Sequence, residues 1–183
     1  MFKFQEKILL NQIKSGNQQA FAKIYDFYLD KIYRFIYFRV SDENLARDFT
    51  SETFIKVLNY IKGGQEIENF QSFLYQTARN LIVDFYRQKR QEELPIDEFI
   101  EENIVEEKDL ASEVADKFEL EKIQNALKQI PDHYREVIVL RFIEDLPFKE
   151  IAKIIGLKED HTRVLVHRGL KMLRQQLSGH NYS

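Results

Sequence analysis

Two stretches of the sequence concentrate cations in a pattern that suits binding to nucleic acid rather than catalysis. Residues 76–90 carry three arginines and one lysine against a single aspartate, interleaved with aromatic side chains. Residues 163–174 carry three arginines and one lysine without any acid. Cations neutralise phosphates, while polar and aromatic groups hydrogen-bond to unstacked bases or stack on them. The sequence therefore predicts two separate segments that contact nucleic acid.

Asp48 and Glu52 form a candidate site of a second kind, a pair of carboxylates one helical turn apart. Phe49 and Thr53 lie beside them. A carboxylate pair suits a basic partner surface, and the flanking apolar atoms would supply buried area. The alternative is that these acids only solvate the surface of a helix, and spacing alone favours this alternative.

The sequence lacks the usual signals for catalysis, metal binding and membrane insertion. It contains no cysteine, which excludes disulfides, thiolate metal sites and cysteine nucleophiles. Its four histidines do not have metal-ligand spacing, and there is no phosphate-binding glycine loop, nucleophile elbow or HExxH motif. No apolar run is long enough for a signal peptide or a bilayer span. We therefore expect no catalytic residue, no metal, no cofactor, and a cytoplasmic protein without membrane insertion.

The charge changes abruptly along the chain, although the formal net charge is only −3. Residues 92–121 hold 13 acids against two lysines, and the part up to about Asp116 suits a tether better than a packed helix. Few glycines and prolines, and no lasting alternation of apolar and polar residues, favour helix over sheet. We predict an all-α protein with two small helical domains, residues 1–91 and 117–183, joined by an acidic linker over residues 92–116.

Apolar periodicity predicts the helices of the N-terminal domain. The first ends near residue 15 and is expected to turn Ile8, Leu9 and Ile13 inward. The segment Ser41-Asp42-Glu43 breaks the next helix and supplies an N-cap, and Asn69 can cap a later one. The remaining predicted helices cover residues 18–38 (one helix or two), 43–61 and 70–90.

The stretch from Leu146 to Leu177 reads as two helices joined by a tight turn. Gly156 stands where a helix C-terminus often needs a positive φ, and Leu157 is expected to fill the corner. Small Ala152 would let the second helix, from about Glu159, cross the first closely. This is the layout of a helix-turn-helix, whose second helix can enter a DNA major groove. The expected apolar stripe of that second helix is Thr162, Val166, Leu170, Leu173 and Leu177.

The order of these motifs resembles that of bacterial RNA polymerase sigma factors, and more narrowly that of the compact extracytoplasmic-function (ECF) group. The resemblance covers roughly residues 18–90 and 118–177. It implies a protein without chemistry of its own that binds core RNA polymerase, directs it to a promoter and helps to melt the DNA. The motifs that carry it are FAKIYDFYLDKIYRFIYFRV, ARDFTSETFIKVLNYI, FQSFLYQTARNLIVDFYRQKR and the helix-turn-helix stretch.

The resemblance also implies roles for particular residues. The clamp helices of the polymerase largest subunit would be bound by Asp48, Phe49, Glu52 and Thr53. The minus-ten promoter element would be bound by Arg79, Asn80, Tyr86, Arg87, Lys89 and Arg90. The minus-thirty-five element would be bound by Arg163, Val164, Leu165, His167, Arg168 and Lys171. The polymerase flap and an anti-sigma factor are the further partners that the family implies.

Aromatic residues in the 70–90 segment have two possible roles. Phe73 and Phe85 are expected in the core, since phenylalanine is usually buried. Tyr75 and Tyr86 fit either the core or a platform on which bases stack.

The chain departs from the family pattern in places that keep alternatives open. Ser51 stands where glutamine is frequent, and Lys158 where serine or proline usually starts the second helix. Asp160-His161 replaces small residues, and Val164-Leu165 replaces the frequent Ser-Arg. Val164 and Leu165 could pack on thymine methyl groups, or one of them could extend the core stripe. The alternative functions are a stand-alone helix-turn-helix regulator and a helical adaptor without promoter recognition.

Overall fold

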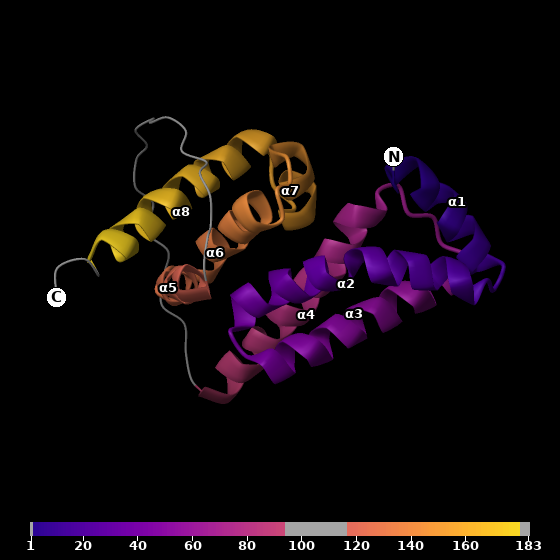
Figure 1. Cartoon of the computed structure of the whole chain (residues 1–183), viewed down its shortest axis with the longest axis horizontal. Coiled ribbons are helices and arrows are strands. Elements are labelled where there is room, and N and C mark those ends of the chain that lie inside the picture. Colours follow the sequence, from indigo (N-terminus) through magenta and orange to yellow (C-terminus); the bar gives the residue numbers. More distant parts are fainter. Residues whose placement is uncertain (1, 94–116, 180–183) are drawn as a thin grey trace. The chain divides into compact units, whose positions relative to one another are not determined.

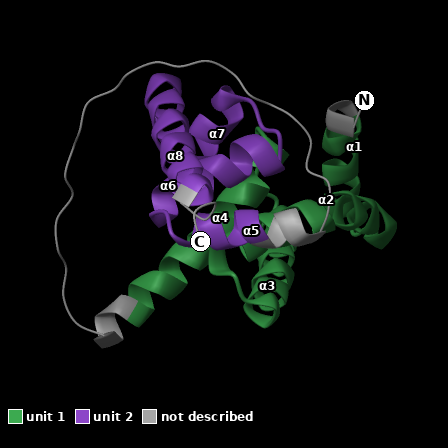
Figure 2. Cartoon of the chain, turned by 60° about the vertical axis from the view of Figure 1, so that its left-hand side comes forward, with its two compact units in different colours: residues 1–89 green, residues 90–183 purple. Residues whose placement is uncertain are grey.

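The chain is divided into two compact units, residues 1–89 and 90–183 (Figure 2). The computed structural model describes residues 2–93 and 117–179, with side chains over residues 5–89 and 122–178. Every regular element in these ranges is a helix, which confirms the all-α prediction. None of the described helices has the length and apolarity to cross a membrane. Most of the predicted acidic linker falls outside the described residues.

The first unit consists of four helices (Figure 1). They are α1 (Phe2–Lys14), α2 (Gln18–Val40), α3 (Glu43–Lys62) and α4 (Phe70–Glu93). Residues 18–40 form one helix, which decides between the two possibilities left by the sequence. Helix α1 packs on α2 and α3, and α2 packs on α3. Aromatic contacts tie α4 to its neighbours, since Phe35 of α2 meets Tyr75 edge-on and Phe49 of α3 meets Phe85.

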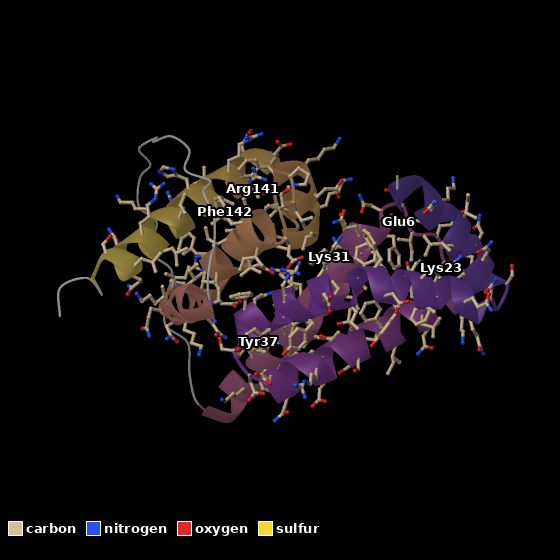
Figure 3. All side chains as sticks on the ribbon, viewed as in Figure 1. Glu6, Lys23, Lys31, Tyr37, Arg141 and Phe142 are labelled. Carbon is tan, nitrogen blue, oxygen red and sulfur yellow. The ribbon has the colours of Figure 1, made fainter. Side chains whose placement is uncertain are left out.

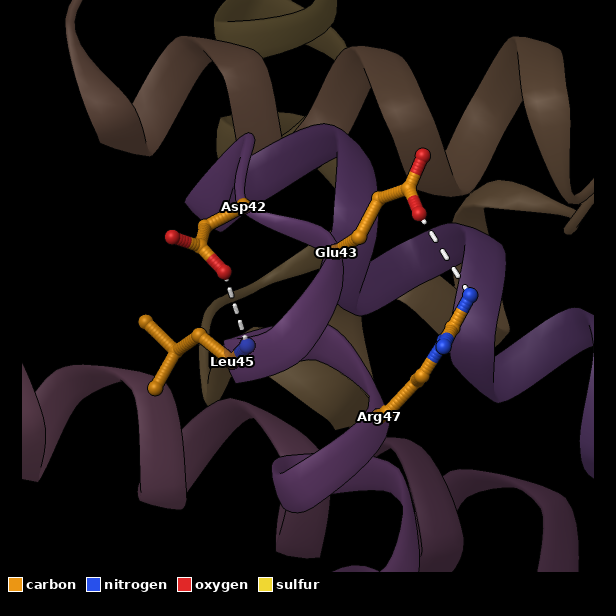
Figure 4. A network of polar contacts seen from close by, with 4 residues as sticks. All are labelled: Asp42, Glu43, Leu45 and Arg47. Atoms are coloured by element: carbon orange, nitrogen blue, oxygen red, sulfur yellow. Dashed lines mark hydrogen bonds and ion pairs between the residues drawn. The ribbon is translucent and has the colours of Figure 1, made fainter.

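Local hydrogen bonds define the starts of three helices in this unit. The side chain of Asn17 accepts from Ala20 N at 3.1 Å, and that of Asn69 accepts from Ser72 N at 2.8 Å. Asp42 caps α3 by accepting from Leu45 N at 2.9 Å (Figure 4). Ser41 ends α2 with a left-handed φ of 57°, which lets the chain turn sharply into α3. The predicted caps at Asp42 and Asn69 are thus confirmed.

Helix α1 is rotated slightly from the orientation predicted by the sequence. Leu9 and Ile13 are buried as expected, but Ile8 is 52% exposed and Leu10 is buried instead. The buried face therefore runs through positions 6, 9, 10 and 13, the spacing of one side of a helix. Glu6, which is labelled in Figure 3, is buried on this face. It accepts a hydrogen bond from the Tyr28 hydroxyl, which joins α1 to α2. This hydrogen bond offsets part of the cost of burying a carboxylate beside Leu9, Leu10 and Ile13.

The second unit contains a helical pair that precedes the helix-turn-helix. Helix α5 (Lys117–Lys128) is followed by α6 (Asp132–Ile138), which continues into the π-helix η1 (Val139–Ile143). Arg135 of α6 donates to the carbonyls of Leu127, Lys128 and Ile130 at 2.8–3.2 Å, and so caps the end of α5. Phe142 of η1 is apolar but 48% exposed, because the wider π turn rotates it away from the core.

The predicted helix-turn-helix is formed by α7 (Phe148–Ile155) and α8 (Glu159–Gly179). Gly156 ends α7 with a φ of 74°, as the sequence predicted. Leu157 does not fill the corner, since it is 45% exposed. Its backbone N–H turns back to the carbonyl of Ala152 at 3.0 Å, and this bond leaves the side chain outside. On α8, Thr162, Val166 and Leu173 are buried, whereas Leu170 and Leu177 are half-buried.

Close packing of α6 against α8 depends on Gly169. A Cβ atom at Gly169 would lie 3.1 Å from Ile138 Cγ1 and 3.2 Å from Tyr134 Cβ. It would also lie 3.3 Å from the Tyr134 carbonyl oxygen, which belongs to the backbone of α6.

Helix α6 also carries His133. Burial lowers the pKa of His133 below its ordinary value, although Asp132 and Glu136 act in the opposite direction.

Removing the α3 cap should destabilise the first unit. We expect Asp42→Ala to lower the free energy of unfolding by about 1 kcal/mol, because the Leu45 N–H loses its acceptor. Urea unfolding followed by circular dichroism measures this change. Asp42→Asn keeps a side-chain oxygen and should unfold close to wild type. Equal unfolding of the alanine variant and wild type would contradict the capping role.

Adding one methyl group at the α6–α8 contact should destabilise the second unit. We expect Gly169→Ala to cost roughly 1–3 kcal/mol, because the neighbouring backbone cannot move aside and overpacking exceeds the gain in helix propensity. Gln175→Ala, an exposed position of the same helix, serves as the control. A thermal midpoint that rises in Gly169→Ala would show that the helices can separate at little cost.

Candidate protein and nucleic-acid interfaces

The four residues of α3 that were expected to bind a partner protein lie on two different faces of the helix. Asp48 and Glu52 are exposed, as the prediction requires. Phe49 is only 9% exposed and packs on Phe85 with 5.5 Å between ring centroids. Thr53 is fully buried and donates its hydroxyl hydrogen bond to the Phe49 carbonyl at 2.6 Å. Phe49 and Thr53 therefore belong to the core of the unit, and only the two carboxylates are presented outward.

The exposed face of α3 also contains an apolar residue that the sequence analysis missed. Ile55 is 59% exposed and stands seven residues after Asp48 and three after Glu52, on the same side of the helix. Ser51 is exposed on this face too. The sequence did contain a sign of this exposure, because Ile55 does not lie on the apolar stripe of its helix. Glu52 forms an ion pair with Lys56 at 3.1 Å, and both side chains are about half exposed. Such a surface pair contributes little to stability and can be exchanged for another partner.

Helix α4 presents a polar and cationic face along its second half. Asn80, Arg87 and Lys89 are exposed, while Arg79 and Tyr86 are half-buried. Asn80 and Arg87 are seven residues apart and share one side of the helix. Arg87 pairs with Asp84 at 3.0 Å, with both side chains more than half exposed. Arg90 lies on the same helix, but its side chain is outside the described residues.

The aromatic residues of α4 are mostly structural. Tyr75 is 1% exposed against Phe35, so it is a core residue and not a platform for bases. Phe73 and Phe85 are half-buried and pair with Tyr60 and Phe49, as expected for residues that face the core. Tyr86 is also half-buried, and its ring packs on that of Phe85 with 5.4 Å between centroids.

Helix α8 presents the third candidate surface. Arg163 and Lys171 are exposed, and His167 and Arg168 are half-buried. Val164 and Leu165 are also half-buried, so neither is enclosed in the core like Val166. Arg163 donates to the Glu159 carboxylate at 2.6 Å, and its guanidinium lies 4.4 Å from the centre of the Phe148 ring. This helix therefore combines cations with apolar atoms on its accessible side.

These three surfaces lack the grouping of acids and histidines that would hold a metal ion. Within the part of the chain that the structure describes, no group of three or more such residues is suitably placed. The surfaces offer exposed charge, amide and apolar groups on regular helices. Groups of these kinds are suited to binding a partner.

Family models match both units of the chain. The model of sigma-70 region 2 matches residues 24–92, and that of sigma-70 region 4 matches residues 120–173. Two solved structures share the fold. CnrH, in complex with the cytosolic domain of CnrY, has a TM-score of 0.71 at 22% identity, with 95% of this chain and 97% of that chain covered. RpoE, in complex with the anti-sigma factor NepR from Bartonella quintana, has a TM-score of 0.68 at 20% identity, with 87% and 98% covered.

A relative in sequence determines the family. The ECF RNA polymerase sigma factor SigW of Bacillus subtilis (strain 168) is 34% identical over 176 residues, which cover 92% of this chain and 94% of SigW. A stand-alone helix-turn-helix regulator is not favoured, because the match includes the first unit as well as the second. The chain belongs to the ECF RNA polymerase sigma factors, and it is a sigma factor that directs transcription.

Proposed function

We propose that the three helical surfaces divide the work of promoter-specific initiation. The exposed face of α3 binds the clamp helices of the polymerase largest subunit, α4 recognises and melts the minus-ten element, and α8 reads the minus-thirty-five element. Residues 1–91 and 117–183 are the corresponding functional domains, and residues 92–116 connect them. The observation that supports this division best is that each helix buries one side in its own unit and leaves contact positions implied by the family, except Phe49 and Thr53 of α3, wholly or partly accessible.

The α3 surface suits a basic helical partner. Asp48 and Glu52 supply two negative charges one turn apart, and Ile55 adds apolar area next to them. Charged groups at the rim of an interface steer association, while a buried apolar group contributes through its removal from water. Phe49 and Thr53 support this surface from inside and do not themselves contact polymerase. The second unit is proposed to contact the polymerase flap, which gives the protein a second binding site on polymerase.

The α4 surface suits a strand that has left the duplex. Asn80 can hydrogen-bond to the edge of an unstacked base, and Arg87 and Lys89 can hold the phosphates beside it. Arg79 and Arg90 extend the same cationic helix. Tyr86 provides the accessible ring for stacking. Asp84, which now pairs with Arg87, would be replaced by a phosphate when DNA binds.

The α8 surface suits a major groove. Arg163, Arg168 and Lys171 supply donors for bases and phosphates, and His167 adds another polar group. Val164 and Leu165 pack on thymine methyl groups, since both remain partly accessible. The sigma factor acts in the cytoplasm and carries out no chemistry itself, because polymerase supplies the catalytic site.

An anti-sigma factor is the proposed regulator of this protein. The solved structure of RpoE contains its anti-sigma factor, and CnrH was solved with the cytosolic domain of CnrY. A regulator that covers the α3 surface would compete directly with polymerase for Asp48, Glu52 and Ile55. The charge of that surface predicts a basic contact region on the regulator.

Reversing the charge of the α3 surface should weaken binding to core polymerase. We expect Asp48→Lys combined with Glu52→Lys to raise the Kd roughly tenfold or more, since two attractive contacts become repulsive. Fluorescence anisotropy with labelled protein and purified core enzyme measures the change. Asp26→Lys combined with Asp30→Lys is a matched control, because these exposed acids have the same spacing on α2. Equal affinity of both double variants would remove Asp48 and Glu52 from the interface.

Truncating the polar face of α4 should impair promoter melting without preventing polymerase binding. We expect Asn80→Ala and Arg87→Ala each to reduce the permanganate reactivity of minus-ten thymines by several-fold, because a base contact or a phosphate contact is lost. The template is a promoter selected with the wild-type holoenzyme. Gln88→Ala, at the exposed neighbouring position, should melt the promoter normally. Normal reactivity in both test variants would refute the assignment of α4.

A further inference from the structure

The guanidinium group of Arg163 is held by groups from two different helices. The Glu159 carboxylate, one turn earlier on α8, accepts a hydrogen bond from Arg163 Nη2 at 2.6 Å. The ring of Phe148, the first residue of α7, lies below the guanidinium with 4.4 Å between the ring centre and Cζ. The arginine is therefore bonded through Nη2 and covered on one face, although about half of its side chain is exposed.

The Phe148 ring is itself anchored to the turn that precedes α7. Arg141 of η1 is labelled in Figure 3. Its Cζ atom lies 5.1 Å from the centre of the same ring. Its Nη1 atom donates to the Leu146 carbonyl at 3.1 Å and lies 3.7 Å from the Asp145 carboxylate. Leu146 is buried, so this carbonyl belongs to a fixed part of the unit. The ring that supports Arg163 is thus positioned by η1 and the following turn.

This arrangement restricts the direction in which Arg163 can donate. A guanidinium is a planar fork with five N–H donors, and here one Nη2 donor and one face are engaged. Its remaining donors are pre-oriented, so less conformational entropy is lost when they bind a ligand. The nearby carboxylate also offsets part of the charge, which reduces attraction to phosphates in general. Directed donors with a reduced charge suit a base edge better than the DNA backbone.

The position of Arg163 in α8 points to the same ligand. It is the fifth residue of a helix that starts at Glu159, and recognition helices contact base edges mainly with their N-terminal residues. Among base edges in the major groove, guanine presents two acceptors, O6 and N7, that match two arginine donors. Arg163 donates one of its five N–H groups to Glu159, so it keeps enough donors for that paired contact.

We propose that Phe148 and Glu159 are positioning residues that direct Arg163 to a guanine edge and thereby determine part of the DNA specificity of the second unit. The proposal rests on the proposed role of α8 in reading the minus-thirty-five element. Phe148 supplies the support for the guanidinium, and Glu159 supplies its orientation. Neither residue needs to touch DNA.

The experiment compares the base preferences of holoenzymes that differ only in this cluster. Purified core polymerase is combined with the full chain and incubated with double-stranded DNA containing a randomised upstream segment. Sequencing of the bound fraction gives the preference at each position, and filter binding gives the affinity for the whole pool. The variants are Arg163→Ala, Phe148→Leu, Phe148→Tyr, Glu159→Gln and Asp160→Asn.

Each variant has a distinct expected result. Arg163→Ala should remove a guanine preference at one position, by roughly tenfold or more. Phe148→Leu, which lacks the ring, should reduce that preference about three- to fivefold while the pool affinity changes by less than about twofold. Phe148→Tyr restores the ring and should restore the preference. Glu159→Gln should reduce the preference, whereas Asp160→Asn removes the same charge one residue later and should leave it intact.

Two outcomes would overturn the proposal and are distinguishable from failure of the proposed function. If Arg163→Ala removes a preference but Phe148→Leu and Glu159→Gln do not, Arg163 reads DNA without positioning residues. If Phe148→Leu weakens binding to all sequences equally and lowers the thermal midpoint, the ring has only a structural role. If no variant, including Arg163→Ala, changes any preference, the assignment of Arg163 under the proposed function fails as well.

Discussion

The contact between Phe49 and Phe85 fixes the rotation of two functional helices at once. The rings meet edge-on with 5.5 Å between centroids, one from α3 and one from α4. Edge-to-face pairs of this kind add to the area that the rings bury. With Phe49, Thr53 and Val57 buried together, Asp48 and Glu52 are left on the exposed side of α3. With Phe85 turned inward, Arg87 and Asn80 are left on the exposed side of α4. The proposed protein-binding and DNA-melting surfaces therefore share an aromatic contact between the buried sides of their helices.

The second unit obeys a related constraint through close packing instead of aromatic contact. Gly169 lets α8 approach the backbone of α6, and Gly156 lets the chain reverse between α7 and α8. These two glycines set how deeply α8 is embedded and where it begins. Its buried side carries Thr162, Val166 and Leu173, and its outer side keeps Arg163 and Lys171 accessible. The position of the recognition surface thus depends on two glycines, which have no side chain, as well as on the side chains that α8 presents.

Several proposed contact residues are paired with an oppositely charged neighbour on the same helix. Glu52 pairs with Lys56, Arg87 with Asp84, and Arg163 with Glu159. All of these pairs are substantially exposed, so their contribution to folding is small. The first two can be exchanged for a partner at little cost, whereas the proposed role of Glu159 requires it to stay paired with Arg163. They also reduce indiscriminate attraction to other charged surfaces. This helps to explain how a protein with a formal charge of −3 can present DNA-binding faces.

The sequence by itself determined the helices, their ends and the family. Caps at Asp42 and Asn69 and the turn at Gly156 are formed by residues within a few positions of one another, so local spacing is enough to predict them. The family was likewise predicted from the order of four sequence motifs, without the structure. Apolar periodicity also predicted much of the buried side of each helix, but only the tertiary structure decided where the edge of that side lies. It moved Phe49, Thr53 and Tyr75 into the core, and it left Ile55, Phe142 and Leu157 exposed. It also brought Phe148 to Arg163, which is fifteen residues away in the chain. The physical reason is that the rotation of a helix is set by partners distant in sequence, whereas its ends are set by neighbours.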